Sequence, residues 1–313
     1  MIIAPTLTMM AVAAPIKGEW KPAYARQQLD LQMNSTGYPF NPQFSAGEDM
    51  IVGGQIVDPP HKYPYLTSMQ RNWPASPGPF CGSAIVAPNW ILTAAHCTEG
   101  STPSPNELTL LINWDDYTVT DPVQGVVRKV AAIFDHPDYV PQTLENDVSL
   151  LYVEDPVPAG QGGVSYGLLD DGTYSAVGQK GPVMGWGRID NGNPSTFPDR
   201  PHEVEVPIWN NFRCNEPQSY PGQVTDDMIC AGETGECSCN GDSGGPMVTK
   251  TATGDFITGV VSWGAGQCGA PNLPGVYARV SVFKQWIESF TMDADFSLAT
   301  TKAKHTLMTP TKA

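Results

Sequence analysis

The sequence predicts an all-β fold, and three observations support this. Short apolar or alternating runs recur along the chain, separated by turn residues. Glycine and proline are abundant, at 31 and 30 of 313 residues, while charged residues make up only 16%. Between residues 55 and 165, no helical spacing of apolar residues is sustained. Short strands at this spacing are typical of a barrel or a sandwich, and the residues alone leave both open.

The expected strands follow these runs in chain order. The segment Pro64–Met69 alternates like a half-buried strand, and Trp90–Thr93 is a short apolar run. Asp147 stands directly before another apolar run, which extends from Val148 to Val153. The remaining strands are expected at Ser83–Val86, Leu108–Ile112, Val126–Val130 and Phe256–Trp263.

One helix is expected, near the C-terminal end. Four apolar residues stand at helical spacing between Val282 and Phe290, namely Phe283, Trp286, Ile287 and Phe290. This pattern predicts a short helix that packs on the strands. The polar, proline-rich stretch 190–201 is expected to be a loop.

The two ends of the chain differ from its middle. Residues 1–14 resemble a secretory signal, with Ala11 and Ala13 in an Ala-x-Ala cleavage pattern. Residues 15–50 are polar and proline-rich, as expected of a pro-segment or a disordered linker, and carry the glycosylation sequon Asn34-Ser35-Thr36. Residues 291–313 are expected to be a polar tail. The sequence contains no run of about 20 apolar residues, so we expect no membrane span.

The charge balance excludes one class of partner. The formal net charge is −15, and nucleic-acid binding relies on cationic side chains that neutralise phosphates. We therefore expect no nucleic-acid partner, and we interpret the acidity as that of a solvated surface.

A glycine-rich turn surrounds Ser243. The stretch Cys239–Pro246 reads Cys-Asn-Gly-Asp-Ser-Gly-Gly-Pro, and glycine permits backbone angles that other residues resist. Such a turn can expose the hydroxyl and direct backbone N–H groups at one point, where an oxyanion would form during acyl transfer. Alone, the stretch could also be a surface turn with a passive serine.

Two further motifs precede it, Leu92–Cys97 around His96 and Asn146–Leu151 around Asp147. Together the motifs resemble the trypsin/chymotrypsin-like serine proteases, whose catalytic residues occur in the order His, Asp, Ser. The resemblance covers about residues 51–290, and Pro182–Gly187 resembles a core strand of the family. It implies two packed six-stranded Greek-key β-barrels, at about 51–165 and 166–280, with the active site between them.

The resemblance also implies a role for each motif residue. Ser243 would attack the peptide carbonyl, His96 would transfer the proton, and Asp147 would orient the imidazole. The N–H groups of Gly241 and Ser243 would bind the oxyanion. The stretch Ser262-Trp263-Gly264 would pair with an extended substrate, as an added β-strand does.

From these roles we expect a secreted, extracellular enzyme that needs no cofactor or metal. Its partners would be protein or peptide substrates and protease inhibitors, and we expect a monomer. A non-catalytic binding or inhibitor protein on the same fold is the alternative, because fold does not imply function. No motif surrounds the other histidines, so all are expected at the surface: His61, His136, His202 and His305.

The chain has seven cysteines, and spacing alone does not give their connectivity. The resemblance implies the pairs Cys81–Cys97, Cys214–Cys230 and Cys239–Cys268, which indicate an oxidising compartment. Cys237 is then left over. A zinc site is the rival interpretation, although no Cys/His cluster has the spacing of zinc ligands.

The stretch Ile51-Val52-Gly53-Gly54 resembles the mature N-terminus of the family. Cleavage before Ile51 would free an α-amine, which in the family pairs with the aspartate before the nucleophile, here Asp242. The chain departs from the usual pattern at Met50, where the family has Arg or Lys. We therefore expect a zymogen that trypsin does not activate.

The resemblance places the primary specificity pocket at Cys237, Ser238, Gly264 and Gly275. Trypsin-like members carry an aspartate where this chain has Cys237, and a neutral thiol offers no partner to a buried cation. We therefore expect a preference for aromatic, Leu or Met residues before the scissile bond. Alternatively, Glu236 could turn inward and restore trypsin-like basic specificity.

Overall fold

The computed structural model describes residues 53–71, 73–75, 78–99, 105–120, 124–189 and 197–292. The chain divides into two compact units, residues 1–44 and 45–313, and every described residue belongs to the second. The segments expected to be a signal peptide (residues 1–14) and a pro-segment (residues 15–50) lie outside the described residues, as do Ile51 and the tail from residue 293 onward.

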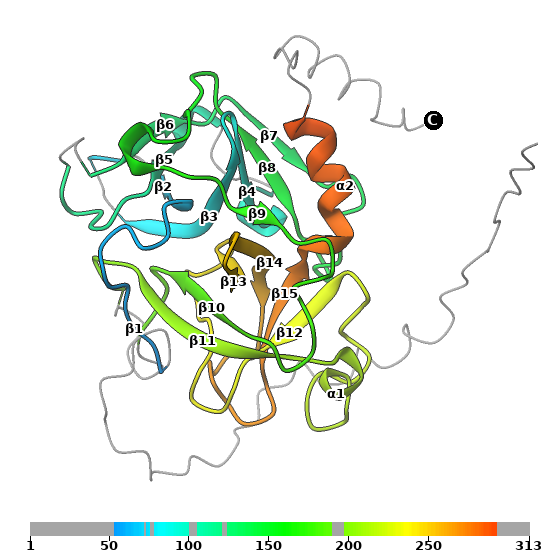
Figure 1. Cartoon of the computed structure of the whole chain (residues 1–313). Helices are drawn as coiled ribbons and strands as arrows, with labels where there is room; N and C mark the ends of the chain where they lie inside the picture. The colour runs from blue at the N-terminus through cyan, green and yellow to red at the C-terminus, as the bar shows by residue number, and fades with distance from the viewer. Residues whose placement is uncertain are drawn as a thin grey trace, which may run out of the picture. The chain divides into compact units, whose positions relative to one another are not determined.

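The first half of the described chain forms an antiparallel sheet of seven strands (Figure 1). Their order is β6-β5-β2-β3-β4-β8-β7, and β6 does not pair with β7 within the described residues, so the sheet is a half-barrel. The strands are β2 (Leu66–Arg71), β3 (Pro79–Ala87), β4 (Trp90–Thr93), β5 (Leu108–Ile112), β6 (Val126–Lys129), β7 (Ala132–Asp135) and β8 (Ser149–Tyr152).

The second half closes into a six-stranded barrel. Its order is β11-β10-β13-β14-β15-β12, and β12 pairs back with β11 through Ile208 and Ala231. Two short strands extend this sheet, because β1 pairs with β11 and β9 runs parallel to β14. The bounds are β1 (Gln55–Ile56), β9 (Leu168–Leu169), β10 (Lys180–Gly185), β11 (His202–Trp209), β12 (Met228–Ala231), β13 (Pro246–Thr251), β14 (Gly254–Trp263) and β15 (Gly275–Arg279).

The predicted C-terminal helix is confirmed as α2 (Val280–Thr291), which buries Phe283 and Ile287. The ring of Phe290 lies 5.4 Å from that of Trp90 in the half-barrel, so the C-terminal part of this helix packs against the first sheet. Figure 1 shows α2 beside β7 and β8. A shorter helix, α1 (Asn211–Cys214), begins after the cap Asn210, whose side chain accepts the Arg213 N–H.

The all-β prediction is confirmed, with two corrections to the histidines. His202 is only 2% exposed in β11, where sequence analysis expected a surface residue. His136 is half-buried, and its ring lies 5.0 Å from that of Trp286. Desolvation lowers the pKa of both imidazoles. Local sequence carries no sign of these contacts because residues distant in the chain make them.

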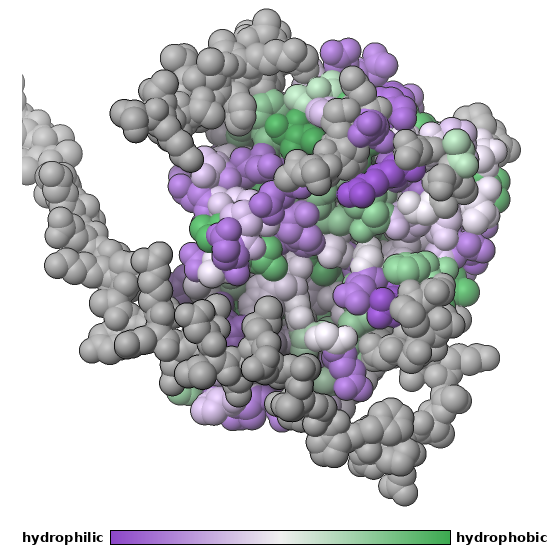
Figure 2. Space-filling model, turned by 180° about the vertical axis from the view of Figure 1, so that it is seen from behind, coloured by the Kyte–Doolittle hydropathy of each residue, from purple (hydrophilic) through white to green (hydrophobic). Residues whose placement is uncertain are grey.

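Polar contacts join the two sheets beside the site. The Tyr65 hydroxyl, ahead of β2, donates to Asp255 on β14 at 2.8 Å. The Gly82 N–H on β3 donates to the Ser243 carbonyl at 2.7 Å. These bonds hold the chain around Ser243 against the half-barrel. On the face shown in Figure 2, polar residues alternate with small apolar areas over the described surface.

Candidate active site

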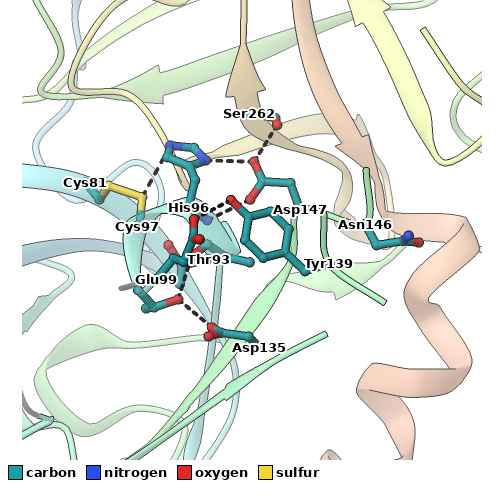
Figure 3. A network of polar contacts seen from close by, with 12 residues as sticks. Cys81, Thr93, His96, Cys97, Glu99, Asp135, Tyr139, Asn146, Asp147 and Ser262 are labelled. Carbon is teal, nitrogen blue, oxygen red and sulfur yellow. Dashed lines mark hydrogen bonds and ion pairs between the residues drawn. A yellow bond between two sulfur atoms is a disulfide. The ribbon is translucent and has the colours of Figure 1, made fainter. Parts of the chain in front are cut away.

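His96 and Asp147 meet at the end of the half-barrel (Figure 3). His96 lies in a 3₁₀ turn, Ala95–Cys97, just after β4, and Asp147 lies just before β8. Asp147 is 1% exposed, and its Oδ1 accepts the His96 backbone N–H at 2.8 Å. Its Oδ2 lies 2.7 Å from His96 Nδ1. Because a carboxylate only accepts hydrogen bonds, Nδ1 carries the proton and Nε2 is left as the acceptor.

A third donor reaches the same carboxylate. The Ser262 hydroxyl, on β14 of the barrel, donates to Asp147 Oδ2. The family resemblance implied only that Ser262 lies on a substrate-pairing strand, and this bond was not predicted. The buried carboxylate thus has three donors, as a buried acceptor requires.

Ser243 is held close to the chain that carries His96. Gly244 has φ +78°, and a Cβ on it would lie 2.2 Å from Thr93 Oγ1 and 3.2 Å from the Ala94 nitrogen. Only glycine lets the Ser243 turn approach the end of β4 this closely. The Ser243 hydroxyl makes no hydrogen bond to any residue that the structure describes. The turn that carries Ser243 therefore lies against the chain that carries His96, although no hydrogen bond joins the two side chains in the part of the chain that the structure describes.

The chain before Ser243 turns tightly. The Asp242 N–H donates to the Cys239 carbonyl at 3.0 Å, so Asn240 and Gly241 are the central residues of a turn. Gly241 has φ +101°, a conformation that favours glycine. The Arg188 N–H donates to the Asn240 carbonyl at 2.7 Å. Within the described ranges, the N–H groups of Gly241 and Ser243 have no acceptor and remain available to a ligand.

Asp242 is fully buried beneath this turn. Its carboxylate accepts the Gly187 N–H at 2.8 Å and the Cys239 N–H at 2.9 Å. Desolvation raises the pKa of this carboxyl to about 6, although the two N–H bonds oppose the shift. No described cation pairs with it. A cationic partner would stabilise the charged form of this buried carboxylate.

A cavity opens beside Ser243. Its lining includes all of the predicted pocket residues, Cys237, Ser238, Gly264 and Gly275, and all of the predicted substrate strand, Ser262, Trp263 and Gly264. A Cβ on Gly275 would lie 3.0 Å from Ser238 Oγ and 3.1 Å from the Tyr277 hydroxyl, so glycine keeps this wall open. Ser238 Oγ and the Tyr277 hydroxyl are themselves 3.1 Å apart and hydrogen-bonded.

Cys237 is a free thiol that is 4% exposed, and desolvation raises its pKa, so the group is neutral near pH 7. Glu236 does not line the cavity; its Cγ lies 2.9 Å from where a Cβ on Gly53 would be. The cavity wall at this point is therefore uncharged.

Three disulfides are present, and they join the pairs that the family resemblance implies: Cys81–Cys97, Cys214–Cys230 and Cys239–Cys268. Among the described residues, the candidate metal cluster is Cys81, His96 and Cys97. A disulfide occupies both of its sulfurs, so the set cannot offer two thiolates to zinc. None of the described helices has the length and apolarity needed to cross a membrane.

Comparisons with known proteins agree with this arrangement. Residues 51–287 match the family model described as trypsin. The chain is 35% identical over 258 residues to a tryptase of Mus musculus, covering 77% of this chain and 88% of that protein. It is 33% identical over 244 residues to trypsin-3 of Salmo salar, covering 77% of this chain and 93% of that protein. The chain belongs to the trypsin family and is a serine endopeptidase.

Proposed function

We propose that this chain is a secreted endopeptidase, made as a zymogen, in which His96, Asp147 and Ser243 form the catalytic triad. The observation that carries the proposal is the buried Asp147 carboxylate, which contacts both the backbone N–H and Nδ1 of His96. This carboxylate fixes the imidazole tautomer and leaves Nε2 as the base.

The proposed reaction uses the side chains in sequence. His96 Nε2 accepts the Ser243 proton while Ser243 Oγ attacks the peptide carbonyl, and Asp147 stabilises the resulting imidazolium. The imidazolium then protonates the leaving amine, and an acyl-enzyme remains. Water, activated by the same imidazole, hydrolyses this ester. Nucleophile–base hydrogen bonds are often long in free enzymes, so the Ser243–His96 bond would form with substrate bound.

The developing oxyanion would be stabilised by two backbone donors. The N–H groups of Gly241 and Ser243 flank the turn at Asp242 and have no acceptor among the described residues. The Arg188 N–H orients the Asn240–Gly241 peptide through its 2.7 Å bond to the Asn240 carbonyl. A preformed donor pair costs no reorganisation during the reaction.

The substrates would be proteins or peptides with a large apolar side chain before the scissile bond. That side chain would enter the cavity at Cys237, where burial keeps the thiol neutral. An arginine or lysine there would lie unpaired, at a high desolvation cost. The edge formed by Ser262, Trp263 and Gly264 would bind the substrate backbone as an added strand. Proteins that mimic such a strand would act as inhibitors.

Activation would follow cleavage after Met50. The new α-amine of Ile51 would pair with Asp242, whose buried carboxylate has no described cation. In this proposal residues 1–14 are a signal peptide, residues 15–50 a pro-segment and residues 51–290 the protease. The three disulfides support an oxidising, extracellular location.

A fluorophosphonate probe tests this proposal. The chain cut before Ile51 should be labelled, and the label should map to Ser243 by peptide mass spectrometry. The cut His96→Ala variant should label far more slowly because it lacks the base that activates Ser243. The uncut chain should also label slowly, because its Ile51 amine is not free to pair with Asp242. Absence of label from the cut chain would favour a non-catalytic role, and label at another serine would contradict Ser243 as the nucleophile.

A further inference from the structure

Asn240 and Gly241 form an Asn-Gly pair at the centre of the turn before Ser243. Asn240 is exposed, and Gly241 follows it with φ +101°. Gly241 also provides one of the two oxyanion donors in the proposed function. A chemical change at this pair would therefore act directly on the catalytic site.

The Gly241 N–H and the Asn240 side-chain amide are the two groups that can react with each other. No described residue accepts the Gly241 N–H or hydrogen-bonds to the Asn240 side-chain amide. Gly241 has no Cβ to shield its nitrogen, which is the reason that glycine after asparagine permits attack on the side-chain carbonyl. Exposure gives water access to the product of that attack.

We propose that Asn240 is a site of spontaneous deamidation that inactivates the enzyme. The Gly241 nitrogen attacks Cγ of Asn240 and loses its proton, and the side-chain nitrogen leaves as ammonia. The new C–N bond closes a five-membered succinimide. Water then opens either ring carbonyl and leaves an aspartate or an isoaspartyl linkage. The net reaction consumes one water and releases one ammonia, with no oxidant or cofactor.

The surrounding contacts explain why the succinimide and isoaspartyl forms would lose most of the activity. The succinimide has no hydrogen on the Gly241 nitrogen, so one oxyanion donor is lost. The isoaspartyl form lengthens the main chain by one carbon where Gly241 is tightly enclosed. A Cβ on Gly241 would lie 2.9 Å from the Phe197 ring and 3.0 Å from Gly187 Cα. The longer chain therefore shifts the N–H, and loss of one such donor costs roughly 10²- to 10³-fold in kcat.

The turn also sets the rate of the reaction. The Asn240–Gly241 peptide must rotate to bring the Gly241 nitrogen to Cγ, and the Arg188–Asn240 bond at 2.7 Å resists that rotation. This hydrogen bond should therefore slow deamidation. Because the attacking nitrogen must lose its proton, the reaction accelerates as pH rises.

The modification can be measured without any activity. The full-length Ser243→Ala chain is incubated in heavy-oxygen water at neutral and at mildly alkaline pH, and its peptides are mapped by mass spectrometry. Aspartyl and isoaspartyl products carrying heavy oxygen should accumulate at Asn240, faster at the higher pH. Asn272 is also exposed but precedes Leu273, so it should stay intact. The sequence holds one other Asn-Gly pair, Asn191-Gly192, so that peptide is scored separately. An Asn240 that stays unmodified overturns the proposal.

The effect on function rests on the proposed triad and has its own test. The active native enzyme and its Asn240→Gln variant are incubated in parallel, and each is scored against its own starting activity. Glutamine would have to close a larger ring, so the variant should lose activity much more slowly, while intact-mass analysis excludes self-cleavage. Equal rates of decline would overturn the inactivation. If Ser243→Ala proved active, the proposed function would fail, whereas the mapped modification would stand.

Discussion

Ser262 donates its hydroxyl hydrogen bond to Asp147 Oδ2, the carboxylate oxygen that also contacts His96 Nδ1. Ser262→Ala removes one of three donors to a buried carboxylate. Hydrogen bonds to charged groups contribute about 1.5–3 kcal/mol, so we expect a loss of roughly tenfold or more in kcat/KM. With one donor fewer, the Asp147 carboxylate should favour the protonated imidazole over the neutral base, so the acid limb of the kcat/KM profile should move to higher pH.

Ser262→Thr keeps a hydroxyl and serves as the matched control, which should recover part of the activity and the native pH profile. Steady-state kinetics across pH on the cut enzyme measures both quantities. An unchanged profile in Ser262→Ala would mean that this bond does not act through His96.

Burial of the Asp242 carboxylate should make the stability of the uncut chain depend on pH. Its folded pKa is about 6 against an ordinary value of 3.8, so the fold favours the protonated form. The unfolding free energy should therefore fall as pH rises from about 4 through about 6, by up to about 3 kcal/mol for a shift of this size. Asp242→Asn resembles the protonated form, so the variant should lose much less stability over this range. Urea unfolding at several pH values measures the difference.

The cut enzyme should show a different dependence of stability on pH. Once the Ile51 amine pairs with Asp242, the pair should hold the amine pKa above its ordinary value near 8. Its stabilisation is then present below that value and is lost as pH rises through the folded pKa. Equal pH dependence in native and Asp242→Asn uncut chains would contradict the assigned cost of burial.

If the chain is a zymogen, as proposed, Met50 predicts which enzymes can activate it. Trypsin should not activate the native chain, because the nearest basic residue upstream is Arg26 and a cut there leaves Ile51 without a free amine. Met50→Arg should make the chain activatable by trypsin, with Ile51 as the new N-terminus. N-terminal sequencing together with a peptide assay checks both. Full activity of a native chain that begins at Gln27 would refute the zymogen account.

The sequence predicted several strands that coincide with continuous apolar runs. The runs Trp90–Thr93 and Leu108–Ile112 coincide with β4 and β5. It did not predict β12 (Met228–Ala231), which forms a strand by pairing with residues of β11 and β15 that are distant in the chain. The local sequence therefore predicted more of the strands of the first sheet than of the strands that close the barrel.

The same limit applies to the site. The motifs around His96 and Asp147 are local patterns, and the structure places the two side chains in contact. The Ser262–Asp147 bond joins residues 115 positions apart, and no local pattern encodes it. Burial of His202 was missed for the same reason.

Cys237 predicts how specificity can be changed. Cys237→Asp places a carboxylate in the cavity beside Ser238, where it can pair with a substrate cation. We expect the ratio of kcat/KM for tosyl-Arg over succinyl-Ala-Ala-Pro-Phe substrates to rise by about tenfold or more. Cys237→Ser also removes the thiol but adds no charge, so it should keep the apolar preference. A native enzyme that already prefers arginine would refute the uncharged-pocket argument.

Ser243 is proposed as the nucleophile, and the kcat/KM of the Ser243→Ala enzyme decides whether it is. Both native and variant chains are cut before Ile51, checked by N-terminal sequencing, and assayed on the same succinyl-Ala-Ala-Pro-Phe substrate. We expect a loss of roughly 10⁴-fold or more, because only the oxyanion donors and substrate binding remain. Retention of native activity by Ser243→Ala would contradict it.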